Sequence, residues 1–183
     1  MIDLKTGRFV IDAEKGWEVH PFMTREEFMQ SDMFKTVLNK KEFTEEDEVF
    51  CFLVNIDGYE MYMRIITGGR HNCVENISLI SKRFDEINNY KCMPDNWEEI
   101  AYEIKHIHDD FLLKETTLNQ TCLEREKENW FDVSWGSIRS SFDLRYDDPY
   151  AEIVIDYRNR TQEEDEELGR EIEELGDAFF DVI

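Results

Sequence analysis

Basic residues are scarce in this sequence. Its 183 residues include 21 lysines and arginines against 43 aspartates and glutamates, which gives a formal net charge of −22. Residues 161–177 contribute −8 of this charge, and the rest is spread over the remaining chain. A field of this sign repels nucleic acid and anionic membranes, and it speeds the docking of a basic protein. We therefore predict a basic protein as partner, with no nucleic-acid and no membrane partner.

Metal-like cysteine spacing is also missing. None of the four cysteines belongs to a CxxC pair, so we predict buried, reduced thiols instead of a metal centre. The first residues are polar and do not resemble the apolar stretch of a signal peptide. No apolar run approaches the length that spans a bilayer. Together these absences predict a cytoplasmic protein.

Catalytic and cofactor motifs are absent as well. The chain has no Walker or dinucleotide fingerprint and no GxSxG context for a serine nucleophile. In KHIHDDF, His106 and Asp110 have the spacing of metal ligands on a helix, whereas His108 falls on the apolar stripe and is predicted to be a core residue. No motif singles out two of the 43 acidic residues as a general acid and a general base. We predict no cofactor, no metal site and no catalytic residue, and hence no enzyme.

Apolar residues make up 41% of the chain and aromatic residues 13%. This is enough to form a hydrophobic core, although the chain carries a high net charge. Residues 48–56, EVFCFLVNI, are apolar on both faces, as in a central strand. Asp57-Gly58 then predicts a hairpin turn to a strand over 59–67, and a third strand is expected over 73–81.

Helix starts are indicated by acidic residues placed three positions after a capping residue. Thr24 with Glu27 and Asp95 with Glu98 both fit a capping box. The second pair precedes apolar residues that recur at helical spacing over 97–111, which predicts the most regular helix of the chain.

A second block of strands is expected over 131–135, 138–144 and 151–157. Apolar and polar residues alternate there, which is typical of an antiparallel sheet with one solvated, charged face. Because the strands come in hairpin-linked groups separated by helices, we predict an α+β fold with a mainly antiparallel sheet, packed helices and an acidic C-terminal helix. Residues 1–160 are expected to form one domain, with 161–183 as a helix and tail packed on it.

The acidic segment QEEDEELGREIEELGD occupies residues 162–177. Thr161 with Glu164 fits a third capping box, and Leu168, Ile172 and Leu175 mark an apolar stripe. Acidic pairs four residues apart each cost about 0.2–0.5 kcal/mol in an isolated helix. Two interpretations stay open: a solvated helix face, or a surface that a basic partner requires.

The stretch SWGSIRSSFDLRYDDPYAEIVIDY, residues 134–157, is the most distinctive of the chain. It resembles the C-terminal region of small bacterial immunity-type proteins linked to polymorphic toxins, with their pattern WG-x-I-x-S-x-x-D-x-R before an isoleucine-rich strand. The helix over 95–112 and the early PFMTREEF are compatible with the same group. The resemblance implies a non-enzymatic inhibitor of a toxin. The alternative is that Trp135, Gly136, Asp143 and Arg145 only shape a hairpin, with Gly136 at a bulge or bend.

The favoured hypothesis is an acidic, cytoplasmic immunity protein that neutralises a basic toxin such as a nuclease. The alternatives are an adaptor or structural domain whose acidity serves solubility, and thirdly a small enzyme. The predicted partner-binding residues are acids of the C-terminal segment and, as second choice, of the polar sheet face: Glu163, Glu164, Glu166, Glu167, Glu171, Glu173, Glu174, Asp143 and Glu152.

Overall fold

The computed structural model describes residues 1–38, 48–69, 71–87, 94–116, 118, 128–143, 150–159 and 164. The strands are β1 Phe9–Asp12, β2 Trp17–Val19, β3 Val49–Ile56, β4 Tyr59–Gly68, β5 Cys73–Ser81, β6 Asn129–Val133, β7 Gly136–Asp143 and β8 Tyr150–Tyr157. The helical elements are α1 Arg25–Gln30, the π-helical turn η1 Phe34–Leu38, the 3₁₀ turn η2 Lys82–Glu86 and α2 Trp97–Glu115. None of the described helices has the length and apolar composition that crossing a bilayer requires.

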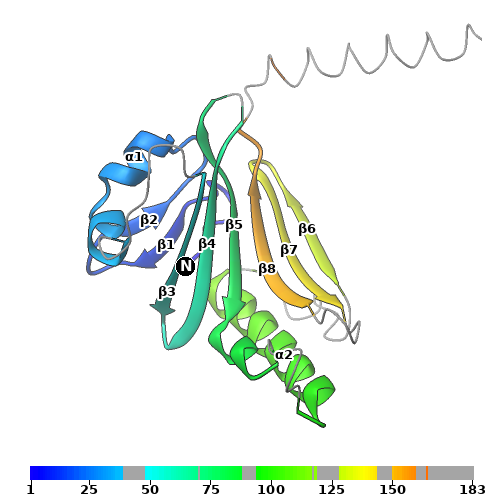
Figure 1. The fold of residues 1–183 in the computed structure, drawn as a ribbon. Helices are drawn as coiled ribbons and strands as arrows, with labels where there is room; N and C mark the ends of the chain where they lie inside the picture. Colours follow the sequence, from blue (N-terminus) through cyan, green and yellow to red (C-terminus); the bar gives the residue numbers. More distant parts are fainter. Residues whose placement is uncertain are drawn as a thin grey trace, which may run out of the picture.

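Two sheets organise the chain (Figure 1). β1 and β2 form a small antiparallel pair, and six antiparallel strands follow the order β3-β4-β5-β8-β7-β6. The predicted α+β fold with an antiparallel sheet is confirmed. The prediction that residues 48–56 form a central strand is wrong, because β3 is an edge strand whose residues alternate between exposed and buried. Sheet order depends on pairing between distant segments, and local composition does not encode it.

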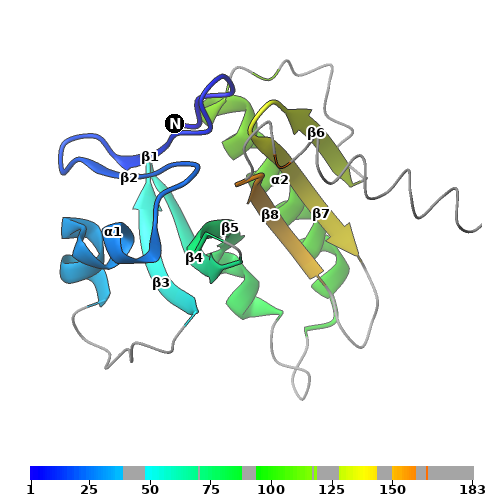
Figure 2. The ribbon, with the colours of Figure 1, turned by 90° about the horizontal axis from the view of Figure 1, so that it is seen from above.

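One face of the six-stranded sheet is covered. The first part of the chain, with Phe9, Val19 and Phe28, packs against buried residues of β3 and β4 in one cluster. Helix α2 packs across β8, β7 and β5, and Figure 2 shows it lying beneath β7 and β8. Trp97 and Ile104 are buried on its inner stripe, as the sequence predicts.

The ladder between β5 and β8, in the middle of the sheet, is short. β5 and β8 pair over four residues, from Asn76–Asp156 to Leu79–Ile153, and then diverge toward the Ser81 end of β5 (Figure 1). Helix α2 crosses this opening and contacts both strands. Where the strands diverge, backbone groups of β5 have no partner on β8, and side chains of α2 can bond to them instead.

The two capping boxes predicted within the described residues have different outcomes. At α1, the Thr24 side chain accepts the Glu27 backbone N–H, and the Glu27 carboxylate accepts the Thr24 N–H, so this box is confirmed. The box predicted at Asp95 is wrong. Helix α2 begins at Trp97 with Asn96 as N-cap and no side-chain capping bond. This start makes Glu98 the second residue of the helix, whereas a capping box needs an acid at the third.

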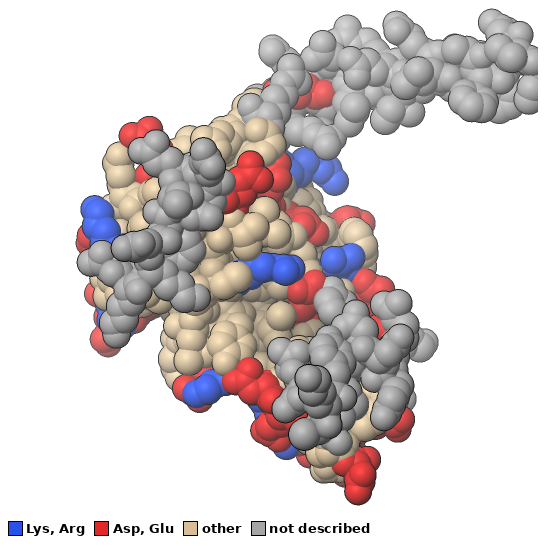
Figure 3. All heavy atoms as spheres, viewed as in Figure 1, with Lys and Arg blue, Asp and Glu red and all other residues tan. Residues whose placement is uncertain are grey.

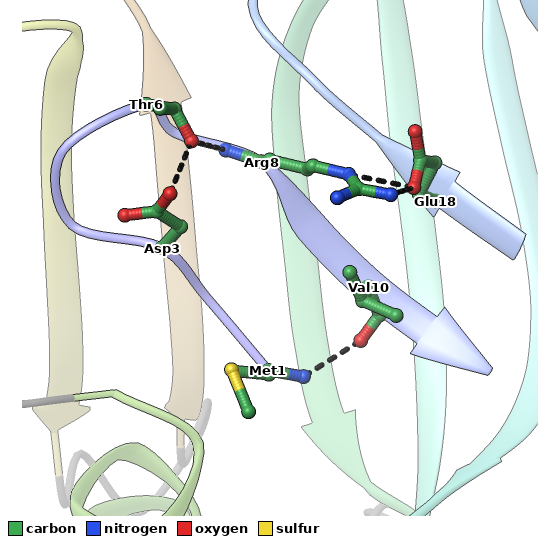
Figure 4. Close-up of polar contacts among 6 residues, drawn as sticks. All are labelled: Met1, Asp3, Thr6, Arg8, Val10 and Glu18. Carbon is green, nitrogen blue, oxygen red and sulfur yellow. Dashed lines mark hydrogen bonds and ion pairs between the residues drawn. The ribbon is translucent and has the colours of Figure 1, made fainter. Parts of the chain in front are cut away.

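The N-terminal residues form a tight hairpin, which the alternation of apolar residues around Thr6 and Gly7 predicts. The Asp3 carboxylate accepts the Thr6 hydroxyl at 2.7 Å, and the Arg8 guanidinium donates to Glu18 on β2 (Figure 4). The Met1 amine donates to the Val10 carbonyl at 2.7 Å and also pairs with the buried Glu115 carboxylate at the end of α2. These contacts join the small sheet to the end of the long helix.

Candidate functional site

The sheet surface opposite α2 is called the outer face below. Strand register places one row of its residues across all six strands, a span of roughly 24 Å at the usual strand spacing. That row is Cys51, Arg64, Ser78, Val154, Arg139 and Trp130. Side chains alternate along each strand, so the two predicted sheet residues Glu152 and Asp143 also lie on this face.

Figure 3 shows acidic and basic side chains close together in small groups, between areas of other residues. Arg64 and Arg139 both belong to the row on the outer face, and each is partnered by an acid: Glu152 for Arg64 and Glu128 for Arg139. The basic side chains of this row are therefore already paired within the chain.

Glu152 is largely withdrawn from solvent. It is 5% exposed, its carboxylate accepts the Ser78 hydroxyl, and Arg64 Nη2 lies 3.6 Å from its Oε2. The prediction of a fully solvated polar face is therefore wrong at this strand. Its neighbours Ser78 and Val154 are also buried, so the centre of the outer face is withdrawn from solvent.

Asp143 lies at the end of β7, opposite Tyr150, and is half-buried. Its predicted role in partner binding stays a prediction. The pairing shows that Asp143 and Glu152 share a face of the sheet without lying side by side, since Glu152 is opposite Ser141.

Glu164 is the one predicted acid of the C-terminal segment within the described residues. Its Oε1 lies 3.0 Å from His71 Nε2, in the turn between β4 and β5. Asn159 ties the same corner together, because its side chain accepts the Phe22 N–H at 2.8 Å and donates to the Val74 carbonyl at 2.6 Å. Within the acidic segment, Glu164 thus contacts the domain through His71. Apart from Glu164, the predicted helix and tail over 161–183 lie outside the described residues. Six of the predicted contacts lie there too: Glu163, Glu166, Glu167, Glu171, Glu173 and Glu174.

Sequence reasoning missed the large apolar side chains exposed on the outer face. Val49, Leu53, Tyr62 and Trp130 are 44%, 42%, 37% and 56% exposed. Interpreting β3 as a central strand assigned Val49 and Leu53 to the core. Alternation could not have found them, because apolar residues occupy both faces of β3. The outer face of β3 is exposed in the fold, as Tyr62 is on the internal strand β4, so this exposure depends on what packs over the sheet.

A charged cluster is buried between α2 and β7. Lys105 and Asp109 are both fully buried, and Lys105 Nζ donates to Asp109 Oδ1 at 2.5 Å. The buried Ser140 hydroxyl donates to the same oxygen at 3.0 Å, while Asp109 Oδ2 has no hydrogen-bond partner among the described residues. An ionised carboxylate in such a place is stable only while its cation remains beside it. The cluster is internal, so its chemistry is that of a structural ion pair.

His108 satisfies a strand backbone group from the helix. Its Nε2 accepts the Ser81 N–H at 3.0 Å, at the place where β5 has separated from β8. Because Nε2 is the acceptor, the neutral ring carries its proton on Nδ1. Burial lowers the pKa of His108 from 6.5 to about 3, with a smaller contribution from the nearby Lys105. The prediction that His108 is a core residue is confirmed.

This histidine makes the fold sensitive to acid. The folded-state pKa of about 3 lies below the ordinary value of 6.5, so the stabilisation is complete above pH 6.5 and is lost as the pH falls toward 3. Between pH 7 and pH 5 the wild type should lose about 2 kcal/mol more unfolding free energy than a His108→Gln variant, whose amide oxygen still accepts the Ser81 N–H. Urea unfolding at both pH values measures this. His106→Gln is the matched control and should follow the wild type, and parallel profiles for wild type and His108→Gln would contradict the assignment.

Trp135 and Gly136, the centre of the immunity-like stretch, have clear structural contacts. The Trp135 indole N–H donates to the Leu4 carbonyl at 3.0 Å, and its ring packs on Tyr157 with centroids 5.5 Å apart. Gly136 has φ +155°, and a Cβ there would lie 1.9 Å from the Asp156 carbonyl oxygen. The hairpin-shaping interpretation accounts for both residues, although it does not bear on the resemblance itself.

Gly136→Ala should therefore be strongly destabilising, by more than the roughly 1–2 kcal/mol that a left-handed backbone conformation costs an L-residue. Gly16→Ala separates the cost of the positive φ from the cost of the close approach to Asp156. Gly16 has φ +68°, and a Cβ added there would meet no described atom within 4 Å. Thermal unfolding of both variants tests this. Equal losses would show that the close approach to Asp156 is relieved at no cost.

Within the described residues, no group of three or more His, Cys, Asp or Glu side chains is placed to hold a metal ion. The described cysteines are the exposed Cys51 and the buried Cys73, both free thiols. The prediction that the cysteines are buried is therefore wrong at Cys51, which lies on the uncovered side of an edge strand. No protein-family model matches the chain, and comparisons with curated proteins and with solved structures find no match.

Proposed function

We propose that the protein is a non-enzymatic binding protein that uses its negative charge to dock a basic partner protein, as an immunity protein would dock a basic toxin such as a nuclease. The observation that carries this proposal is the net charge of −22 on a folded domain, in which Glu164 of the acidic segment pairs with His71. Nuclease sites are basic because they hold phosphates, so an acidic protein competes for the same charges.

The size of the charge favours this function over acidity for solubility alone. A net charge of magnitude about 2–8 is enough to keep a small domain soluble. A charge of −22 also destabilises the compact state through self-repulsion. A basic partner would relieve that repulsion in the complex, which gives the excess charge a use.

The described interior also supports binding over turnover. Lys105, His108 and Asp109, the reactive side chains gathered in one place, are buried and bonded to neighbours. The Ser140 hydroxyl donates to the Asp109 carboxylate instead of to a histidine that could act as its base. On the outer face, Val49, Leu53, Tyr62 and Trp130 are exposed apolar side chains of the kind that protein contacts use.

Affinity purification from the native host tests the proposal. The immobilised protein should retain a basic protein at low salt and release it at high salt, because exposed charges are screened over about 8–10 Å near physiological ionic strength. A Glu173→Gln, Glu174→Gln double variant should associate several-fold more slowly with the purified partner.

The matched control replaces Glu98 and Glu99, exposed acids at the start of α2, with glutamine. It makes the same change in net charge, so it measures the effect of bulk charge alone. Failure to retain any basic protein at low salt would refute the proposed function. If the Glu173→Gln, Glu174→Gln variant associates at the same rate as the control, the acidic segment is not part of the contact with the partner.

A further inference from the structure

An apolar strip lies on the outer face along the edge of the sheet. It consists of Val49, Cys51 and Leu53 on β3 with Tyr62 on β4, and is called the β3–β4 strip below. All four residues are exposed, and Leu53 is directly opposite Tyr62 in the strand register. Val49 to Leu53 covers roughly 14 Å along the strand. The strip is therefore continuous, unlike the isolated apolar residues common on protein surfaces.

Acidic residues border the strip at both ends. Exposed Glu48 precedes Val49, and exposed Asp57 and Glu60 lie beyond Leu53 at the hairpin. The Tyr62 hydroxyl donates to Asp85 at 2.6 Å, which fixes the ring beside a further exposed carboxylate. Three cations lie close by: Lys82 is 3.4 Å from Glu60, Lys114 is 3.9 Å from Asp57, and Arg64 is directed to Glu152.

We propose that the β3–β4 strip is the docking surface for a basic partner whose contact region carries apolar side chains surrounded by lysines or arginines. This inference rests on the proposed function and names its surface. Protein interfaces combine an apolar centre with a polar rim, and tyrosine is a frequent anchor because it supplies a large contact area at low entropic cost. The strip supplies the apolar centre, and Glu48, Asp57 and Glu60 supply a rim of complementary sign.

The same rim disfavours a second copy of this chain. Two strips facing each other would bring their acidic borders together in chains that each carry −22, and like-charge juxtaposition costs several kcal/mol. Nucleic acid and anionic membranes are repelled by the same charges. A basic protein surface is the occupant that relieves both the exposed apolar area and the repulsion.

Cys51 provides a reporter inside the strip, because its thiol is exposed and lies between Val49 and Leu53. The probe is a synthetic peptide of alternating lysine and leucine, with poly-L-lysine as a probe of charge alone. Binding is followed by fluorescence anisotropy of the labelled peptide. Alkylation of Cys51 by iodoacetamide is followed by peptide mapping, which separates it from the other cysteines. A Ser134→Cys variant in a Cys51→Ser background places a control thiol in the exposed β6–β7 turn.

At saturation the lysine–leucine peptide should slow Cys51 alkylation about tenfold and leave the Ser134→Cys thiol unchanged. Leu53→Ser should weaken binding of this peptide about tenfold without affecting poly-L-lysine, because only the apolar contact is removed. Leu53 is exposed, so the variant should fold normally.

Three results would overturn the docking surface: no binding of the peptide, unprotected Cys51 at saturation, or unchanged affinity of Leu53→Ser. Protection of Cys51 in a dimer of the free protein, detected by light scattering, would replace the basic partner with a second copy. The proposed function is judged separately by capture from the host. If a basic protein is captured but Cys51 is not protected, the proposed function is retained and only the β3–β4 strip is rejected as the docking surface.

Discussion

Replacing Lys105 with methionine is expected to lower the free energy of unfolding by about 3–5 kcal/mol. Methionine keeps much of the length and the apolar stem of the side chain but removes the ammonium that donates to Asp109. Asp109 would then be a buried charge held by the Ser140 hydroxyl, with its second oxygen already lacking a partner among the described residues. Urea denaturation at neutral pH measures the loss.

Two further variants make this result specific. Lys114 is an exposed lysine on the same helix as Lys105, and its Nζ lies 3.9 Å from Asp57. Lys114→Met should lower the free energy of unfolding by no more than about 1 kcal/mol. Combining Lys105→Met with Asp109→Leu should recover much of the stability, because neither charge then remains buried. A Lys105→Met loss as small as that of Lys114→Met would mean that the Lys105 ammonium does not stabilise the folded protein through Asp109.

Ile104→Ala is expected to lower the free energy of unfolding by about 2–5 kcal/mol, the range for truncating a fully buried aliphatic side chain. Ile104 is 0% exposed and packs in the cluster formed by Trp97, Ile100, Ala101 and Ala151, where α2 meets β8. The cavity left behind cannot close easily, because the sheet on the other side is held by its own ladder.

Ile107→Ala is the natural comparison, since it removes the same atoms from the same helix at a half-buried position. It should cost clearly less than Ile104→Ala. Equal midpoints of chemical denaturation for the two variants would contradict the assignment of Ile104 to the inner stripe.

Local signals in the sequence predicted many elements correctly. The Asp57-Gly58 turn, the Thr24 capping box and the apolar stripe of α2 depend on residues only a few positions apart, so composition and spacing encode them. The buried ion pair shows the limit of such signals. Lys105 and Asp109 have the four-residue spacing of an ordinary exposed helix pair. Only the packing of β7 onto that side of α2 buries them.

The candidate site could be predicted only in part. The acidity could be read directly from the sequence, whereas the choice of acids that contact a partner stays a prediction; Glu164 pairs with His71. Glu152 was expected on a solvated face but is enclosed by Ser78 and Arg64. The other six acids of the segment stay predictions.

By itself, the sequence determined the charge of the molecule, its α+β class and the starts and turns of several elements, because these depend on composition and on neighbours along the chain. The tertiary structure alone decided that β3 lies at the edge of the sheet, that β5 meets β8 across a long intervening stretch of chain, and that Val49, Leu53 and Tyr62 remain uncovered. Exposure of an apolar side chain depends on which distant segment packs over it, and no local pattern carries that information.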